Sequence, residues 1–441
     1  MGSTTVESIE IEKLAHGGDG LGYMPDGRVL FVEGGVPGDV VDVELSEDKG
    51  SWARGRVASV RQESEHRVDV ECDAFDRGCG GCQFWHVDYQ RELEWKVDAA
   101  AEAMKRISGL DMPTPKTVAA PSVRDYRNRV TYHQRYVDGT LRRGFFAQKT
   151  GDVVAVDRCP VARPALDEAI AELGQVLDML GEAEISVETC GEGKAVALIE
   201  LRPGQSIERD HLDELALRVE QGRTVSGVEI LDEDGDYYII GDTTVAAGEV
   251  LAMPPVEGMR IESGRFRQAN TAVNRRMVEH VRDVVDGTWE RPRILELFSG
   301  AGNFSFALAP IADRLLGVEG SEGAVETARR IAELAPEMDH VRFEVGDLSD
   351  VDVVSQALDE PFEVLVVDPP RQGADVVARE LARLDRGGQI IYISCDAACL
   401  ARDAATLAES GWRVDELTCF DMFPRTAHLE TVAIFERTET G

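Results

Sequence analysis

The sequence predicts an α/β protein in which an open, largely parallel sheet follows a small β-barrel and an α+β middle region. Short apolar segments between residues 294 and 393 each end in a glycine, an acidic residue or a cysteine. This is the pattern of buried parallel strands that carry ligand-binding residues at their carboxyl ends. The first 60 residues instead alternate apolar and polar residues between regular turn signals, which predicts a small antiparallel unit.

The first unit, residues 1–60, is predicted to be an OB-like β-barrel. Glycines and prolines separate four segments of alternating polarity, namely 6–11, 28–33, 39–45 and 52–60. The stretch Gly17-Gly18-Asp19-Gly20-Leu21-Gly22 has the composition of a phosphate-binding loop. Its position between short strands favours a hairpin turn instead.

The middle unit, residues 61–265, carries a cysteine motif and a predicted helix from Asp88 to Gly109, which could pack on either neighbouring unit. The spacing C-x6-C-x2-C is followed by a Cys-Pro pair, and the four cysteines are Cys72, Cys79, Cys82 and Cys159. Without a secretion signal, such cysteines indicate a metal or iron–sulfur site rather than disulfides. Zinc also accepts four thiolates, but its usual spacing is two C-x2-C pairs. Three clustered cysteines with a distant Cys-Pro favour a [4Fe–4S] cluster.

The third unit, residues 266–441, contains a nucleotide-binding pattern. A strand at 294–298, the turn Ser299-Gly300-Ala301-Gly302-Asn303 and a helix from Phe304 follow one another, so that backbone N–H groups can approach a ligand. This pattern is a weak signal by itself. The next strand, 314–318, ends in Glu319, which is placed to accept hydrogen bonds from ribose hydroxyls. A third strand, 341–345, ends in Gly346-Asp347, placed for an adenine amino group.

The fourth strand, 364–367, ends in Asp368-Pro369-Pro370. A dinucleotide dehydrogenase is one alternative, but the glycine spacing differs from Gly-x-Gly-x-x-Gly. The Asp-Pro-Pro motif is instead similar to that of S-adenosylmethionine enzymes that act on nitrogen or carbon atoms of nucleobases. Two prolines remove backbone donors and stiffen the turn, which leaves a flat edge for base stacking.

Cys395 follows a fifth strand, 389–393, and precedes a helix-period segment that begins at about Ala397. The cysteine therefore lies at the carboxyl end of a buried strand, where open α/β sheets bind their ligands. A lone cysteine is more often a small packing residue. We interpret three others in that way: Cys190, Cys399 and Cys419. The neighbouring cofactor pattern favours a chemical role for Cys395.

With these motifs the chain resembles the uracil-C5 RNA methyltransferase family, which makes 5-methyluridine in tRNA and ribosomal RNA. The motifs occur in the family's order and are Phe266-Arg267-Gln268-Ala269-Asn270, Leu297-Phe298-Ser299-Gly300-Ala301-Gly302-Asn303-Phe304, Val318-Glu319, Asp368-Pro369-Pro370-Arg371, Ser394-Cys395-Asp396 and His428-Leu429-Glu430. The resemblance implies that Cys395 is the nucleophile and Glu430 the base. It also implies contacts to S-adenosylmethionine from Gln268, Phe298, Asn303, Glu319, Asp347 and Asp368.

The resemblance extends to the upstream units. Residues 1–60 are similar to a TRAM domain, an RNA-binding barrel that commonly precedes this enzyme type. The family often carries an iron–sulfur cluster, with five residues rather than six in the first gap of its cysteine motif. The expected fold is thus a Rossmann-like methyltransferase domain preceded by the barrel and the α+β middle unit.

The residue types match the chemistry that the resemblance implies. C5 of uracil is a poor nucleophile, but a thiolate that adds to C6 turns C5 into an enolate carbon that can accept a methyl group. A base then removes the C5 proton, and the thiol, a tolerable leaving group, is eliminated. RNA cytosine-C5 methyltransferases place a cysteine directly after a proline of the fourth-strand motif. Here Arg371 follows Pro370, which favours uracil.

Net charge is the main objection to an RNA substrate, because the formal charge is −35 and nucleic-acid proteins usually present a basic surface. The 47 basic residues comprise 40 arginines and only 7 lysines, a balance that indicates adaptation to multimolar salt. At 1 M salt the Debye length is about 3 Å, so distant acids do not repel a phosphate backbone.

A local basic stretch supports RNA binding. Its seven basic residues, set against two acids, are Arg124, Arg127, Arg129, Arg135, Arg142, Arg143 and Lys149. Aromatic residues are interleaved with them: Tyr126, Tyr132, His133, Tyr136, Phe145 and Phe146. This combination favours contact with single-stranded RNA over a hairpin whose basic face is merely solvated.

Together these features predict a cytoplasmic, halophilic, S-adenosylmethionine-dependent RNA uridine-C5 methyltransferase with no membrane span and no obligate protein partner. The chain has no run of 18 apolar residues, and its first ten residues lack the features of a secretion signal. Two alternatives stay open: a methyltransferase for another RNA base position, and an RNA-binding or iron–sulfur protein with a degenerate methyltransferase domain. Intact Cys395, Glu430, Gln268 and Asp368 argue against degeneracy. The sequence does not distinguish tRNA from large-subunit ribosomal RNA.

Overall fold

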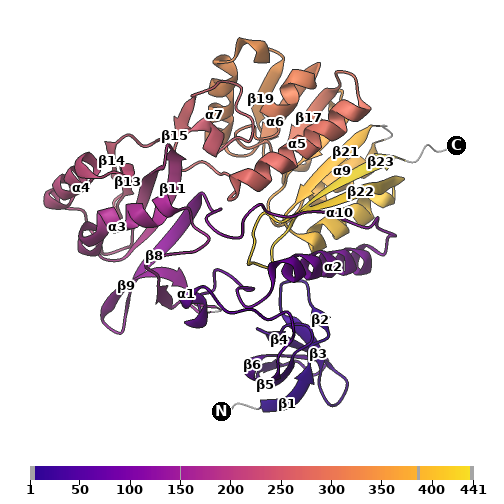
Figure 1. Ribbon diagram of the computed structural model, residues 1–441. Coiled ribbons are helices and arrows are strands. Elements are labelled where there is room, and N and C mark those ends of the chain that lie inside the picture. Colours follow the sequence, from indigo (N-terminus) through magenta and orange to yellow (C-terminus); the bar gives the residue numbers. More distant parts are fainter. Residues whose placement is uncertain (1–4, 149, 385–387, 438–441) are drawn as a thin grey trace.

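The computed structural model describes residues 5–148, 150–384 and 388–437. Figure 1 shows an N-terminal barrel, a middle α+β unit beside it and a C-terminal sheet covered by helices. The long helix α2 (Tyr89–Ser108) lies between the barrel and the C-terminal sheet. In the described part of the chain, no helix is both long and apolar enough to cross a membrane.

The N-terminal unit is a six-stranded sheet with the order β1-β5-β6-β4-β3-β2. Its strands are β1 (Thr5–Glu10), β2 (Lys13–Leu14), β3 (Gly20–Tyr23), β4 (Val29–Glu33), β5 (Val40–Asp48) and β6 (Trp52–Gln62). Alternate residues such as Leu30, Val32, Val41 and Val43 are fully buried and form its core. The turn between β2 and β3 is closed by a bond from Ala15 N–H to the Asp19 carbonyl at 2.8 Å, which confirms the hairpin interpretation of the glycine stretch.

The middle unit is built on a seven-stranded sheet with the order β10-β9-β8-β11-β12-β13-β14. The strands are β8 (Arg129–Val137), β9 (Thr140–Phe146), β10 (Val153–Ala155), β11 (Ala183–Gly191), β12 (Lys194–Leu201), β13 (Val225–Leu231) and β14 (Tyr237–Gly241). The helices α3 (Pro164–Met179) and α4 (Arg209–Gln221) pack on this sheet and bury Leu166, Leu173 and Leu215. The short helix α1 (Asp73–Asp76) and the ribbon β15 (Thr244–Ala246)–β16 (Arg260–Glu262) complete the unit.

The C-terminal sheet has eight strands in the order β19-β18-β17-β20-β21-β23-β22-β7. Its strands are β17 (Arg293–Leu297), β18 (Arg314–Glu319), β19 (Val341–Val345), β20 (Val364–Val367), β21 (Gln389–Ser394), β22 (Trp412–Phe420) and β23 (Glu430–Arg437), joined by β7 (Lys116–Val118). Strands β17 to β21 are parallel, as predicted, and β23 is antiparallel to β21. The associated helices are α5 (Thr271–Thr288), α6 (Ser305–Leu308), α7 (Glu322–Glu333), α8 (Val351–Asp359), α9 (Asp375–Arg383) and α10 (Ala397–Ala408).

Two elements that precede residue 265 are part of the C-terminal unit. Strand β7 pairs in parallel with β22, and helix α2 packs on α10. Helix α2 begins and ends as predicted, because the Asp88 carboxylate accepts a bond from Arg91 N–H at 3.2 Å and Gly109 adopts a left-handed φ of 69°. The C-terminal sheet therefore takes its last strand and one covering helix from residues that precede the proposed boundary at 265.

Candidate active site

Asp368, Cys395 and Glu430 meet at one end of the C-terminal sheet. Val367 pairs with Tyr392 across the parallel strands β20 and β21, so Asp368 leaves the sheet beside the end of β21. Ser394 pairs with Thr431 across the antiparallel strands β21 and β23. Cys395 and Glu430 are the residues next to this last pair, and the charge of Glu430 acts on the Cys395 thiol. The structure thus brings the predicted nucleophile and the predicted base together.

Cys395 is held at a tight strand-to-helix turn. Strand β21 is buried at every residue, and helix α10 begins two residues after the cysteine. The Asp396 carboxylate caps this helix by accepting bonds from Ala398 N–H and Cys399 N–H, both at 2.9 Å. The half-buried thiol is therefore placed by its own strand and helix.

Burial and neighbouring acids shift the pKa values of the reactive pair upwards. Burial, followed by the negative charge of Glu430, raises the pKa of the Cys395 thiol to about 11, while Arg371 opposes the increase. Burial, followed by the charge of Asp368, raises the pKa of Glu430 to about 8, and Arg371 again opposes it. A carboxyl group with a pKa near the operating pH can both accept and release a proton, as general-base catalysis requires. No catalytic role was predicted for Arg371 from the sequence.

The predicted cofactor residues Phe298 and Glu319 lie at the carboxyl ends of β17 and β18. The Glu319 carboxylate accepts bonds from Gly300 N–H at 3.0 Å and Ser321 N–H at 2.8 Å, and thereby ties the glycine turn to the second strand. Phe298 has a φ of 63°, a strained conformation for a residue with a Cβ. A Cβ at Gly300 would meet no atom within 4 Å, so a ligand can approach the backbone there.

Acidic groups gather at this end of the sheet. Burial, then the charge of Glu319, raises the pKa of Asp368 to about 7. Burial also raises the pKa of Glu296 to about 8, with further contributions from Asp368 and Glu319, while a hydrogen bond from Ser305 Oγ opposes the increase. A bound cationic sulfonium would favour the ionised forms of these acids and lower their pKa values. Glu296 was interpreted only as a strand residue, although an acid inside the apolar run Ile294-Leu295-Glu296-Leu297 is a signal that could have identified it.

The other predicted cofactor residues have different surroundings. The Asn303 side chain bridges to α5, since its Oδ1 accepts bonds from Ala252 N–H at 3.1 Å and Asn274 Nδ2 at 3.0 Å, and its Nδ2 donates to Asn274 Oδ1 at 2.9 Å. Asp347 is exposed after β19 and accepts a bond from Ser349 Oγ at 2.7 Å. Gln268 is buried just before α5. Contacts of the six residues to a cofactor stay predictions.

The four motif cysteines line one cavity of about 440 Å³ and belong to one packed cluster with Trp85 and Val156. Burial, then the charge of Cys159, raises the pKa of Cys82 to about 12; burial raises the pKa of Cys159 to about 11. Within residues 5–148, 150–384 and 388–437, no three His, Cys, Asp or Glu side chains converge closely enough to hold a metal ion. Four soft sulfur donors around one cavity nevertheless form a set that suits iron–sulfur chemistry.

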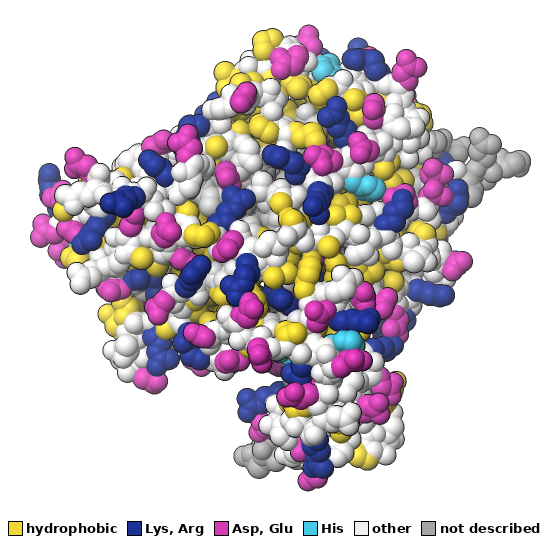
Figure 2. Space-filling model, in the orientation of Figure 1, with side chains coloured by type: hydrophobic (Ala, Val, Ile, Leu, Met, Phe, Trp, Pro, Cys, Tyr) yellow, Lys and Arg dark blue, Asp and Glu magenta, His cyan; other side chains and the backbone are white. Residues whose placement is uncertain are grey.

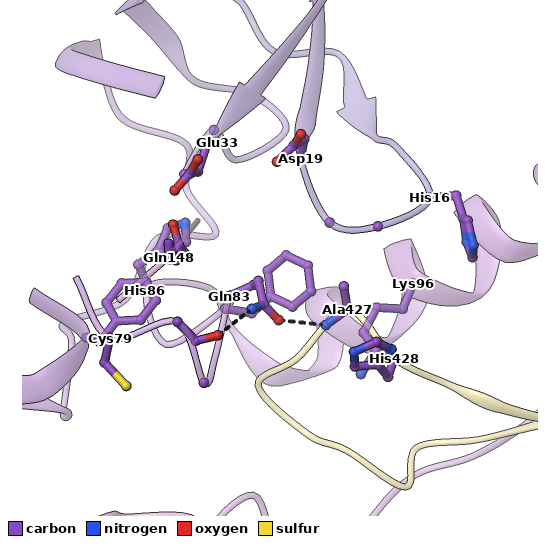
Figure 3. A pocket seen from close by; sticks show the side chains of 18 of the residues that line it. His16, Asp19, Glu33, Cys79, Gln83, His86, Lys96, Gln148, Ala427 and His428 are labelled. Atoms are coloured by element: carbon purple, nitrogen blue, oxygen red, sulfur yellow. Dashed lines mark hydrogen bonds between the residues drawn. The ribbon is translucent and has the colours of Figure 1, made fainter. Parts of the chain in front are cut away.

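A larger cavity of about 780 Å³ runs from the barrel to the reactive cysteine (Figure 3). Its walls come from all three units and include Gly18, Cys79, Phe146, Cys395 and His428. Figure 3 shows His428 beside Ala427 near one side of this space, and Asp19 and Glu33 of the barrel on the opposite side. The barrel therefore forms one wall of the route to Cys395.

Most arginines of the basic stretch 124–149 lie close to carboxylates in the structure. Five of its arginines lie within 4.0 Å of carboxylates, in the pairs Arg124–Glu71, Arg129–Glu188, Arg135–Glu184, Arg142–Asp138 and Arg143–Asp178. Lys149 lies outside the described residues. Figure 2 shows acidic and basic side chains interspersed over one face of the molecule. Four of these pairs take their acid from outside the stretch, so its positive surplus is offset in part by other segments.

The aromatic residues of the same stretch divide into two groups. Tyr126 and Tyr132 are core residues, only 6% and 1% exposed. Tyr136 is 56% exposed, and Phe146 is 37% exposed and stacks on His133 with ring centroids 3.8 Å apart. Among these exposed rings, Phe146 lines the large cavity. The partly buried Phe145 also lines this cavity, so Phe146 is the exposed aromatic residue of this stretch that is best placed to contact RNA near Cys395.

An open parallel sheet with a glycine turn after β17, a carboxylate after β18 and acids at the end of β20 is the fold of a class I S-adenosylmethionine-dependent methyltransferase. The model of the tRNA (uracil-5-)-methyltransferase family matches residues 88–438, and the TRAM domain model matches residues 4–58. The chain belongs to the tRNA (uracil-5-)-methyltransferase family and is an S-adenosylmethionine-dependent RNA uracil-C5-methyltransferase with an N-terminal TRAM domain. The family resemblance and the predicted fold class are thereby confirmed.

Individual relatives are similar over almost their whole length. The 23S rRNA (uracil(1939)-C(5))-methyltransferase RlmD of Vibrio parahaemolyticus is 31% identical, over 99% of this chain and 97% of the relative. The enzyme of the same name from Edwardsiella ictaluri is 33% identical, over 93% and 91%. The crystal structure of Pyrococcus abyssi tRNA (uracil-54, C5)-methyltransferase in complex with S-adenosyl-L-homocysteine has a TM-score of 0.72 and 24% identity, and covers 98% of this chain and 100% of that chain. This last likeness supports the fold.

Proposed function

We propose that this enzyme methylates C5 of a uridine in 23S ribosomal RNA through a covalent bond between Cys395 Sγ and C6 of the base. The observation that carries the proposal is the pairing of Ser394 with Thr431, which brings the neighbouring residues Cys395 and Glu430 together at the ligand-binding end of the sheet, where the charge of Glu430 acts on the Cys395 thiol. The choice of ribosomal RNA is supported by relatives named as 23S rRNA enzymes, whose similarity spans the barrel as well as the catalytic unit.

The residues divide the reaction into two stages. Bound S-adenosylmethionine supplies an electrophilic methyl group, and Gln268, Phe298, Asn303, Glu319, Asp347 and Asp368 are the residues proposed to hold it. In the first stage, the Cys395 thiolate adds to C6, which makes C5 nucleophilic. In the second, after C5 has been methylated, Glu430 removes the C5 proton, the C5–C6 double bond re-forms and Cys395 leaves as a thiolate. The Arg371 charge lowers the pKa of both side chains and so favours their anionic forms.

The two stages are tested by separate variants. Glu430→Gln should methylate each RNA once and then stay attached to it, because the C5 proton cannot leave. Cys395→Ala should form neither adduct nor methylated product. A denaturing gel with S-adenosylmethionine and 23S ribosomal RNA fragments measures the adduct, with tRNA transcripts as the competing substrate. Normal turnover by Glu430→Gln would contradict the assignment of the base, and methylation of tRNA alone would contradict the choice of substrate.

We also infer that Cys72, Cys79, Cys82 and Cys159 hold a [4Fe–4S] cluster, which the shared cavity and the four thiol donors support. Metal binding requires thiolates, so the thiols that burial keeps protonated would release protons on assembly. The acid-rich, lysine-poor composition supports adaptation to high salt. A ribosomal RNA substrate is in keeping with activity in the cytoplasm.

A further inference from the structure

The segment that leads into Glu430 is bound to residues from the N-terminal half of the chain. Glu430 is the first residue of β23, so the preceding loop, residues 421–429, decides where it lies. The centre of this loop is Arg425, which is only 9% exposed and has a φ of 70°. A left-handed conformation at a residue with a Cβ persists only where the surroundings hold it.

The backbone and side chain of Arg425 bind the cysteine turn and helix α2. Its carbonyl accepts bonds from Gln83 N–H at 2.8 Å and Phe84 N–H at 3.1 Å, directly after Cys82. Its N–H donates to Glu92 Oε1 at 2.6 Å. Its guanidinium Nη1 donates to the Val87 carbonyl at 2.7 Å and to Glu92 Oε2 at 3.1 Å. Arg425 therefore joins three segments at one buried point.

Buried charges on both sides of Arg425 strengthen this connection. Lys96 of α2 forms an ion pair of 2.7 Å with Asp421 and donates to the Phe423 carbonyl at 3.3 Å. Tyr89 O–H donates to the other Asp421 oxygen at 2.8 Å. Glu92, Lys96 and Asp421 are each 5% exposed or less. Removing one partner of a buried charge network is strongly destabilising, so this network holds residues 421–425 firmly on α2.

The barrel reaches the same loop. Leu14 and Val36 of the barrel form one small hydrophobic cluster with Phe84 and Val87, and Ala427 packs against it. A Cβ at Gly18 would lie 2.9 Å from Ala427 Cβ, so a larger residue does not fit there. Gln83 bridges the cysteine turn to the loop, since its Nε2 donates to the Gly80 carbonyl at 3.3 Å and its Oε1 accepts from Ala427 N–H at 3.1 Å (Figure 3).

We propose that Arg425 is a positioning residue for Glu430, and that through it the cysteine turn and helix α2 hold the base opposite Cys395. The proposal rests on the function proposed above. Cys395 is placed independently, by β21 and the Asp396 cap of α10. A displaced Arg425 should therefore impair the step that needs Glu430 and leave the step that needs Cys395 intact. The cysteine site would then serve as a structural support for the catalytic base.

The test compares a variant of Arg425 that keeps its charge with a variant of Glu92 that removes the partner charge. Arg425→Lys keeps the positive charge but loses the Nη1 group that donates both to the Val87 carbonyl and to Glu92 Oε2. It should form the covalent RNA adduct at the wild-type rate and release it about tenfold more slowly, because small misplacements of a reacting group are costly. Glu92→Gln, which removes the partner charge, should do the same if Arg425→Lys proves unstable. Arg413→Lys, at an exposed arginine paired with Glu436 on the same sheet, is the matched control.

Equal slowing of adduct formation and release, or no slowing of either, would overturn the proposal. Failure of Glu430→Gln itself to accumulate adduct would instead show that the proposed base is wrong. Hydrogen exchange gives a second readout that needs no RNA. In Cys79→Ala, the backbone amides of residues 421–428 should exchange faster than in wild type. The exchange rates of the β21 amides should stay the same. Unchanged exchange in that segment would show that the cysteine turn does not support the loop.

Discussion

In the free enzyme, the ionisation of Glu430 should change the pKa of the Cys395 thiol. With a pKa of about 11, only on the order of one Cys395 thiol in a thousand is ionised at pH 8, and this fraction grows about tenfold for each pH unit. Glu430, with a pKa of about 8, is about half ionised at that pH. Its anion opposes formation of the thiolate, because two like charges repel at close range. Replacing Glu430 by Gln should therefore lower the pKa of Cys395.

The expected effect is measurable as a rate of alkylation. A nearby charge changes a pKa by about one unit or more, so iodoacetamide should modify Cys395 about tenfold faster in Glu430→Gln than in wild type at pH 9. The difference should shrink below pH 7, where Glu430 is protonated. Peptide mass spectrometry distinguishes Cys395 from the other thiols, and Glu436→Gln, near the far end of the same strand, is the control. Identical rates in wild type and Glu430→Gln at pH 9 would refute the facing arrangement of the two residues.

Three further predictions address the cofactor, the cysteines and the RNA. Glu319→Gln should weaken S-adenosylmethionine binding about tenfold in calorimetry, because a charged hydrogen-bond acceptor is lost, whereas the exposed Glu333→Gln should not. Cys79→Ala should abolish bound iron and the broad visible absorbance of anaerobically purified protein. Cys190→Ala, which changes a cysteine in a separate hydrophobic core, should retain both. Zinc without iron in the wild-type protein would contradict the cluster. Phe146→Ala should weaken RNA binding at least fivefold in a filter-binding assay by removing a stacking surface worth about 1–3 kcal/mol. Tyr136→Ala, on the same hairpin but outside the cavity, should not.

Local sequence patterns were enough to predict the strands of the catalytic sheet and the residues at their ends. The apolar runs around Ile294, Leu315 and Ile390 are long enough for one strand each, and the glycine, acid or cysteine that follows marks where each strand stops. Parallel strands place their carboxyl ends on the same side of a sheet, so Glu319, Asp368 and Cys395 could be assigned to one site before any contact was known. The helix at 89–108 could also be predicted from local sequence, because its cap residues Asp88 and Gly109 directly flank it in the chain.

The position of Glu430 and the pairing of the buried charges depend on contacts between distant segments. Arg425 is held by Glu92, and Lys96 by Asp421, across more than 300 residues of chain. No periodicity or spacing encodes such pairs, because each partner is an ordinary polar residue until the fold brings the two together. The same holds for β7, which is too short to be recognised except by its pairing with β22, and for the arginines of the basic stretch. Strand ends follow from local pattern, whereas buried ion pairs follow from the folding of distant segments onto one another.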